Sequence, residues 1–170
     1  MPTLLVVHHS PTRSTRTLLD QVLAGGNDDA IEGVEILVRP ALETTADDVL
    51  AADGYLLGTP ANFGYMSGAL KHFFDSTFLQ VGGSLSSSGA ADASAGSTAG
   101  RPFGLFVHGR YDTEGAVRSV LSIVGALGWK QASDVFAVLG DVDDAALEGA
   151  YELGATLAAL VMETGPARRA

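Results

Sequence analysis

Three polar segments of the chain carry residue types suited to holding a phosphorylated, planar ligand. The first, HHSPTRST (residues 8–15), directly precedes an amphipathic stretch and contains Arg13, a stiffening proline and four hydroxyls, Ser10, Thr12, Ser14 and Thr15. Hydroxyls and free backbone amides at a helix N-terminus bind phosphate monoesters. Because Ser and Thr are also common helix caps, an ordinary capped turn is the alternative.

Two nucleotide-binding motifs are missing from this region. No G-x-G-x-x-G follows the first apolar run, and no G-x-x-x-x-G-K-[ST] occurs anywhere in the chain. A dinucleotide fingerprint and a nucleoside-triphosphatase loop are therefore unsupported.

The second segment, GTPANFGYMSG (58–68), combines glycines with two aromatic residues. Its glycines let the backbone come close to a ligand, Phe63 and Tyr65 offer aromatic faces, and Ser67 can cap the next helix. This composition predicts contact with a flat ring system. The alternative, aromatic side chains packed in the core, is favoured for Phe73 and Phe74 on the following helical stretch.

The third segment, HGRYDTEG (108–115), follows another apolar run. Arg110 at the end of a strand is suited to stabilising negative charge on a reduced cofactor or to meeting a nucleotide phosphate. His108 could donate a proton or a hydrogen bond to an acceptor, or be satisfied by a neighbouring carbonyl. Asp112 or Thr113 could cap the next helix or contact a ligand.

Alternating strands and helices are expected to position these segments. Short apolar runs predict strands at 3–9, 34–40, 54–60, 102–109 and 134–140, and helical periodicity predicts helices at 14–26, 44–52, from Ser67, 113–127 and 143–163. This alternation predicts a parallel sheet covered on both faces. Since ligands bind beyond the carboxyl ends of such strands, the three polar segments should converge at one edge of the sheet.

Composition limits the classes of partner. The 170 residues fit one domain, and a net charge of −10 with scattered basic residues argues against nucleic acid and anionic membranes. No apolar run reaches the roughly 18 residues of a membrane span. The first residues have neither a basic start nor a cleavage site, and the chain has no cysteine, so we expect a cytoplasmic protein without disulfides or thiolate metal sites.

One segment, residues 80–100, is low in complexity. It consists mostly of Gly, Ser and Ala and carries a single charge, so it cannot fold on its own. We expect a flexible loop here. It is either a tolerated surface insertion, a mobile cover over the site, or a stretch ordered by another subunit.

Taken together, the segments resemble the flavodoxin-like NAD(P)H-dependent FMN reductases, especially quinone reductases of the tryptophan-repressor-binding-protein type. The likeness is carried by GTPANFGYMSGALKHFFD (58–75) and GRPFGLFVHG (100–109), and extends over most of residues 3–163. It implies a three-layer, doubly wound, five-stranded sheet in the order 2-1-3-4-5 and FMN bound without a covalent link. It also implies NAD(P)H as co-substrate and a hydride passed to a quinone-like acceptor.

The resemblance also implies roles for individual residues. By position, Ser10, Thr12, Ser14 and Thr15 would hold the FMN phosphate. The isoalloxazine would be lined by Pro60, Ala61, Asn62, Phe63, Gly64 and Tyr65, joined by His108, Gly109 and Tyr111. His108 and Arg110 are the candidate catalytic residues. Such reductases often complete the pocket from a second subunit, so a homodimer or tetramer is expected, with Gly154 and Ala158 permitting close helix packing.

Several alternatives remain. The nearest is a flavodoxin-like carrier passing electrons to a protein partner, and another is a member of the fold that has lost the flavin. A receiver domain would need an acidic pair after the first strand, where this chain has VVHHS. His8, His9 and His108 are poorly suited to a shared metal ion, since neighbours along a strand point to opposite faces. A serine-hydrolase elbow is not present. The single tryptophan, Trp129, is interpreted as a packing residue.

Overall fold

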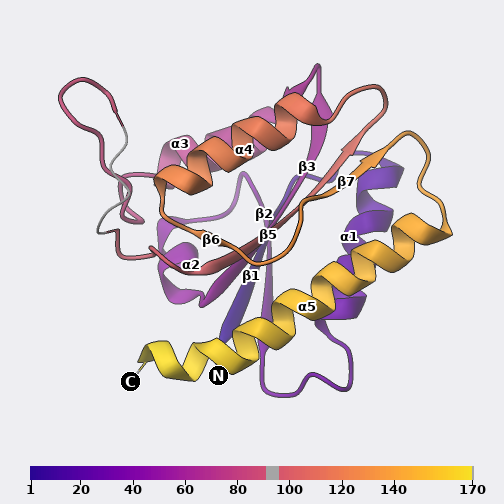
Figure 1. Ribbon diagram of the computed structural model, residues 1–170, viewed down its shortest axis with the longest axis horizontal. Coiled ribbons are helices and arrows are strands. Elements are labelled where there is room, and N and C mark those ends of the chain that lie inside the picture. Colours follow the sequence, from indigo (N-terminus) through magenta and orange to yellow (C-terminus); the bar gives the residue numbers. More distant parts are fainter. Residues whose placement is uncertain (91–95, 170) are drawn as a thin grey trace.

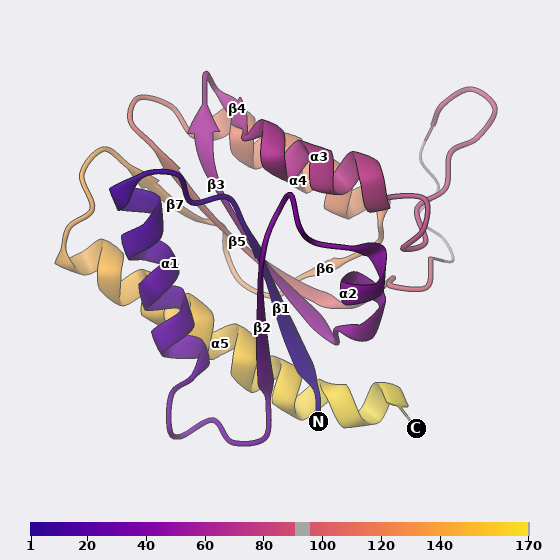
Figure 2. The same ribbon diagram turned by 180° about the vertical axis from the view of Figure 1, so that it is seen from behind.

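The computed structural model, which describes residues 1–90 and 96–169, is a doubly wound parallel sheet between two helical layers (Figures 1 and 2). Its central strands are β1 (Thr3–His8), β2 (Glu35–Pro40), β3 (Gly54–Asn62) and β5 (Pro102–Gly109). They lie in the order β2-β1-β3-β5, with β6 (Lys130–Gln131) and β7 (Phe136–Leu139) both pairing with β5 at the edge. The predicted flavodoxin-like topology is therefore confirmed.

Helices cover both faces of this sheet. Helices α1 (Arg13–Gly26) and α5 (Asp144–Arg169) pack on one face, whereas α3 (Gly68–Thr77), α4 (Glu114–Ala126) and the short α2 (Ala46–Ala51) cover the other. The last helix runs to Arg169 and is longer than the predicted 143–163. The three predicted layers are present.

Side-chain alternation along the strands creates the two cores. In β1, Leu5 and Val7 face the α3–α4 layer, whereas Leu4 and Val6 face α1 and α5, and all four are buried. Successive side chains of a strand point to opposite faces, so an apolar run such as TLLVV fits a strand that is covered on both sides.

Two glycines bring α1 and α5 into close contact. A Cβ added to Gly154 would lie 1.9 Å from the carbonyl oxygen of Val22, and one added to Gly25 would lie 1.9 Å from that of Tyr151. Ala158 on the same stripe is fully buried. The expectation that Gly154 and Ala158 lie in a subunit interface is therefore wrong, because both serve packing within the chain.

Two strands differ from their predicted forms. The predicted fifth strand (134–140) is observed as β7, and the short β6 precedes it along the same neighbour, β5. The third strand was predicted to end at residue 60 in a loop, but β3 continues to Asn62 and turns back as β4 (Tyr65–Met66). The predicted glycine-rich loop is thus mainly a β-hairpin.

The low-complexity segment is anchored at its base. Thr98 is buried, its hydroxyl donates to the Val81 carbonyl (2.8 Å), and it accepts from the Trp129 indole (2.8 Å). Trp129 stacks on Tyr55 with ring centroids 3.9 Å apart, which confirms its packing role. The segment leaves the fold between the end of α3 and the start of β5, away from the β3–β4 hairpin (Figure 1). Its described part does not cover the carboxyl edge, and residues 91–95 lie outside the described residues.

Helix α5 contains one stretch, Asp144–Gly165, that is long and apolar enough to cross a membrane by length and composition alone. Buried helices of globular cores meet the same criterion. Leu153, Leu157 and Val161 of this helix are buried in the core that it forms with α1 and the sheet. The apolar character of α5 is explained by that packing.

Candidate functional site

The first polar segment forms the turn between β1 and α1. Thr12 is the N-cap of α1: its hydroxyl accepts from the Thr15 amide (3.2 Å), and the Thr15 hydroxyl accepts from the Thr12 amide (3.1 Å). Thr15 is buried, so its side chain serves the cap rather than an external ligand. Ser10, Thr12 and Ser14 keep at least partial exposure and can approach a phosphate.

The N-terminus of α1 is electrostatically suited to an anion. A helix N-terminus carries partial positive charge and amides without intrahelical partners, and acidic side chains there are normally favourable. Helices α2, α4 and α5 each carry an acidic residue in the first turn, whereas α1 and α3 carry none, and α1 also begins with the exposed Arg13. The positive end of α1 is therefore left for an external anion.

His8 is the last residue of β1, directly before this turn. Its Nδ1 lies 3.1 Å from the Ser10 hydroxyl. Burial, and then the like charge of neighbouring His9, lowers the pKa of His8. The ring is therefore biased toward its neutral form beside the candidate anion site.

The second segment is a two-residue hairpin between β3 and β4. Its turn residues Phe63 and Gly64 both have positive φ, 51° and 74°, as a type I′ turn requires. A bulky aromatic residue rarely adopts this conformation, and backbone strain of this kind clusters at binding sites. The Phe63 side chain is fully exposed, and Tyr65 is 44% exposed.

The hairpin is held from two directions. The buried Thr59 hydroxyl accepts from the Ser67 amide (2.9 Å) and donates to the Pro60 carbonyl (2.8 Å). On the other side, a Cβ added to Gly115 at the start of α4 would lie 1.8 Å from the Gly64 carbonyl oxygen. Phe63 is thus presented to solvent by a rigid support.

The third segment is bonded to the turn between β7 and α5. His108 Nε2 lies 2.8 Å from the Gly140 carbonyl, and the Gly140 amide donates to the Gly109 carbonyl at 2.8 Å. Arg110 pairs with Asp141 at 2.5 Å, and the hydrogen bond between them raises the pKa of Arg110 and lowers that of Asp141. His108 was expected either to contact a neighbouring carbonyl or to act in catalysis, and the structure contains the carbonyl contact. The catalytic roles of His108 and Arg110 stay predictions.

Three aromatic side chains project from this edge into solvent. They are Phe63, Tyr65 and Tyr111, and Tyr111 exposes 91% of its surface. Asp112 caps α4 by accepting from the Glu114 amide at 2.9 Å, whereas Thr113 makes no side-chain cap bond. Pro60 and Gly109 are buried, so any contact with a ligand would come mainly from the residues beside them.

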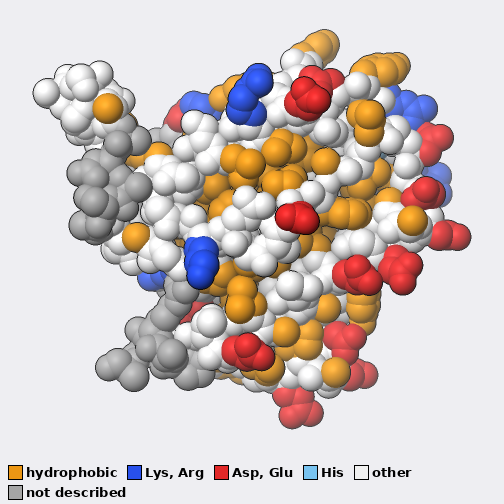
Figure 3. Space-filling model, in the orientation of Figure 1, with side chains coloured by type: hydrophobic (Ala, Val, Ile, Leu, Met, Phe, Trp, Pro, Cys, Tyr) orange, Lys and Arg blue, Asp and Glu red, His pale blue; other side chains and the backbone are white. Residues whose placement is uncertain are grey.

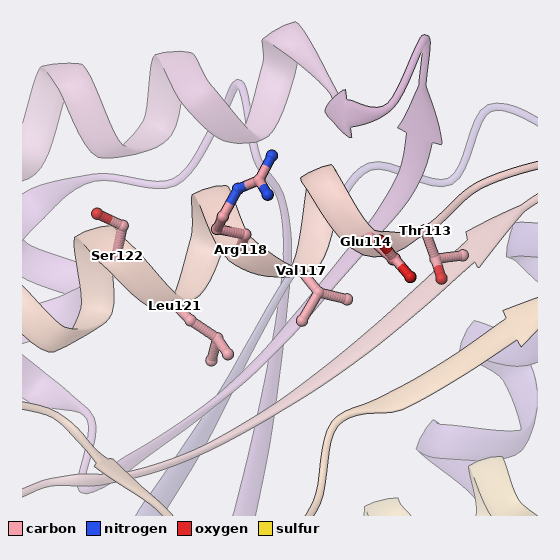
Figure 4. A pocket seen from close by; sticks show the side chains of 6 residues that line it. All are labelled: Thr113, Glu114, Val117, Arg118, Leu121 and Ser122. Carbon is pink, nitrogen blue, oxygen red and sulfur yellow. The ribbon is translucent and has the colours of Figure 1, made fainter.

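Three cavities lie around this edge. One of about 330 Å³ joins the start of α1 to the β7–α5 turn and is lined by Arg13, Ser14, Thr17, Asp141, Val142 and Leu147. Another, of about 410 Å³, lies between the hairpin and helices α3 and α4. The third, of about 620 Å³, is an open apolar depression along Val117 and Leu121 of α4 (Figure 4), and apolar surface extends over this face of the molecule (Figure 3).

Two residues of the site were not found from the sequence. Asp141, which pairs with Arg110, follows the fifth strand, and the rule that placed the other three segments at this edge applies to that turn as well. Thr59 lies within an apolar strand, where its type gave no signal. Among the described residues, no group of three or more His, Cys, Asp or Glu side chains is placed to hold a metal ion.

Known proteins are similar to this chain in part of their sequence and in their architecture. A family model described as NADPH-dependent FMN reductase matches residues 2–143. A flavodoxin of Aquifex aeolicus is 33% identical over 85 residues, which are 50% of this chain and 45% of that protein, so the match spans about half the length of the curated relative.

Solved structures with the same fold superimpose on this chain. A flavodoxin from the domain Archaea superimposes with a TM-score of 0.74 at 17% identity, covering 94% of this chain and 98% of the other. A flavodoxin, WrbA-like protein from Agrobacterium tumefaciens gives a TM-score of 0.69 at 17% identity, covering 96% and 99%.

Proposed function

The chain belongs to the NADPH-dependent FMN reductase family, and we propose that it is an FMN-dependent oxidoreductase passing a hydride from NAD(P)H to a quinone-like or other small acceptor. The observation that carries this proposal is the meeting, at one sheet edge, of an acid-free helix N-terminus with three solvent-exposed aromatic side chains. One element suits a phosphate and the other suits a flat ring.

The residues at this edge fit FMN chemically. The amides of Arg13 and Ser14 at the start of α1, the hydroxyls of Ser10, Thr12 and Ser14, and the charge of Arg13 would hold the phosphate. Phe63, Tyr65 and Tyr111 would cover the ring system and lose their exposure to water in doing so. Thr15 would act indirectly, by holding Thr12 in place.

Bound FMN would supply the redox chemistry of the reaction. The protein's own residues bind and orient. Arg110 and Asp141 form an exposed pair at the edge, with Arg110 available to balance negative charge near the ring. His108 fixes the turn containing Asp141 by its contact with the Gly140 carbonyl, which makes it a positioning residue in this proposal.

An electron carrier is the second candidate function. It is favoured by the similarity to the Aquifex aeolicus flavodoxin and by the acidic net charge, which suits basic protein partners. A carrier would bind FMN equally well but would react poorly with NAD(P)H.

One experiment separates these functions. Purified protein is titrated with FMN while flavin fluorescence is followed. The complex is then mixed with NADPH or NADH without oxygen while the absorbance at about 450 nm, a property of the flavin itself, is recorded. Saturable binding followed by rapid bleaching supports the reductase. Binding without bleaching supports the carrier, and the absence of binding contradicts both.

The homodimer or tetramer and the cytoplasmic location remain part of the proposal. Since Gly154 and Ala158 are used within the chain, any subunit interface must use other surfaces. Sedimentation at micromolar concentration tests the assembly, and a strictly monomeric species would contradict it.

A further inference from the structure

A second basic site lies on the opposite face of the sheet from α1. The cleft of about 410 Å³ between the β3–β4 hairpin and helices α3 and α4 is lined by Gly64, Tyr65, Lys71, Gly115, Arg118, Ser119, Ser122 and Ile123. It therefore contains two of the ten Lys and Arg residues of a chain whose net charge is −10. Its lining includes no Asp or Glu.

Arg118 has no partner in the described part of the chain. It is exposed, and no ion pair or side-chain hydrogen bond involves it among the described residues. Figure 4 shows its guanidinium pointing from α4 to the side of α3 and the hairpin, whereas Val117 and Leu121 point to the other side of the helix. An unpaired guanidinium directed into a cleft is suited to a phosphate or carboxylate ligand.

Lys71 supplies the second positive charge. It pairs with Asp75 one turn along α3 at 2.7 Å, and this hydrogen bond raises the pKa of Lys71. The Lys71 side chain is 37% exposed and that of Asp75 is 63% exposed, and exposed pairs of this kind are weak. Lys71 can therefore exchange Asp75 for a more highly charged ligand.

The cleft is also continuous with the candidate flavin site, because Gly64 and Tyr65 belong to both. The phosphate of FMN is assigned to α1, which packs on the other face of the sheet. An anion bound by Lys71 and Arg118 would therefore belong to another molecule that reaches the flavin across the hairpin.

We propose that the cleft formed by Lys71, Arg118, Ser119 and Ser122 binds a phosphate group of the nicotinamide dinucleotide co-substrate. This inference rests on the proposed reductase function. Two cations and the Ser122 hydroxyl suit a phosphate, whereas the Ser119 hydroxyl donates to the Ala116 carbonyl (2.9 Å) and would have to turn to join them. The shared hairpin directs the nicotinamide end toward Phe63 and Tyr65. If the 2′-phosphate binds there, the cleft determines the preference for NADPH over NADH.

The test is direct binding, measured by calorimetry on the full chain. The probes are adenosine 2′,5′-bisphosphate and ADP, and the variants are Lys71→Ala, Arg118→Ala and, as a matched control, Lys130→Ala, which removes an exposed lysine on β6. Lys71→Ala and Arg118→Ala should each weaken binding by about tenfold, because each removes one hydrogen bond to a charged group. Lys130→Ala should leave the affinity unchanged. Arg118→Lys should restore part of the affinity.

The two probes separate the two phosphate sources. Weakening of both probes supports contact with the 5′-phosphate that both carry, and weakening of ADP alone supports contact with the second phosphate of the pyrophosphate. Weakening of the bisphosphate alone supports the 2′-phosphate. Equal affinities in all three variants, or no binding of either probe to the unaltered protein, would overturn the proposal. FMN titration of the same proteins is independent: if FMN binds and the cleft variants change nothing, only this inference fails, whereas failure of FMN to bind contradicts the reductase itself.

Discussion

The Cα of Gly115 approaches the carbonyl oxygen of Gly64 so closely that a Cβ at Gly115 would lie 1.8 Å from that oxygen. The start of α4 thereby fixes the tip of the β3–β4 hairpin, which carries Phe63. Gly115→Ala should displace the hairpin, cost about 1–3 kcal/mol of stability as an overpacked contact, and weaken FMN binding.

A matched control for this substitution lies in the same helix. A Cβ at Gly125 would meet no atom within 4 Å. Gly125→Ala should therefore gain about 0.5–1 kcal/mol from helix propensity and leave FMN affinity unchanged. Urea unfolding and FMN titration measure both quantities, and equal stability changes in the two variants would show that the hairpin contact is unimportant.

Tyr111→Ala tests the aromatic side of the site. Because the Tyr111 side chain is 91% exposed, its removal should leave the unfolding temperature nearly unchanged. Loss of one ring contact with a bound flavin should weaken FMN binding about threefold to tenfold. Leu79→Ala, an exposed apolar residue just beyond α3, is the control for nonspecific effects and should leave binding unaltered. A Tyr111 variant that binds FMN as tightly as the unaltered protein would mean that the ring lies elsewhere.

Thr59→Val tests the internal support of the hairpin. Valine keeps the shape of the side chain but leaves the buried Ser67 amide without its acceptor, which should cost about 1–3 kcal/mol. Thr59→Ser retains the hydroxyl and should lose clearly less. Chemical denaturation compares the two variants, and an equal loss in both would assign the effect to packing of the Thr59 methyl group.

The sheet and the convergence of the site were predictable because both follow from local pattern. Apolar runs fitted strands covered on both faces, and parallel strands bring the turns after their carboxyl ends to one edge. The positions of Arg13, Tyr65 and Tyr111 at that edge needed no knowledge of individual contacts.

The remaining details depend on tertiary contacts. A type I′ turn is signalled by Asn-Gly or Asp-Gly, and Phe63-Gly64 carries only half of that signal. The pairing of Arg110 with Asp141 joins turns 31 residues apart. Small residues on α5 permit close packing against any helix, so the sequence could not distinguish α1 from a second subunit.

Acidification should destabilise the protein partly through His8. Burial lowers its folded-state pKa below its unfolded value of about 6.5, so the unfolded state binds more protons and stability rises with pH. The stability that the neutral His8 ring contributes is present above its unfolded-state pKa and is lost as the pH falls through its folded-state pKa. Unfolding of His8→Gln at pH 7.5 and 5.0 should therefore show a smaller pH dependence than the unaltered protein. His72→Gln, at an exposed position on α3, is the control, and equal slopes in all three proteins would exclude this role.

Gly154→Ala tests the contact between α1 and α5. Alanine favours a helix over glycine by about 1 kcal/mol, but the added methyl would lie 1.9 Å from the Val22 carbonyl oxygen, and backbone cannot move aside as a flexible side chain can. The clash should outweigh the gain in helix propensity, so the free energy of unfolding measured in urea should fall by about 1–3 kcal/mol. If the variant were instead as stable as the unaltered protein but dissociated on sedimentation, Gly154 would lie between subunits, and the packing of α1 on α5 would not be the reason for a glycine at this position.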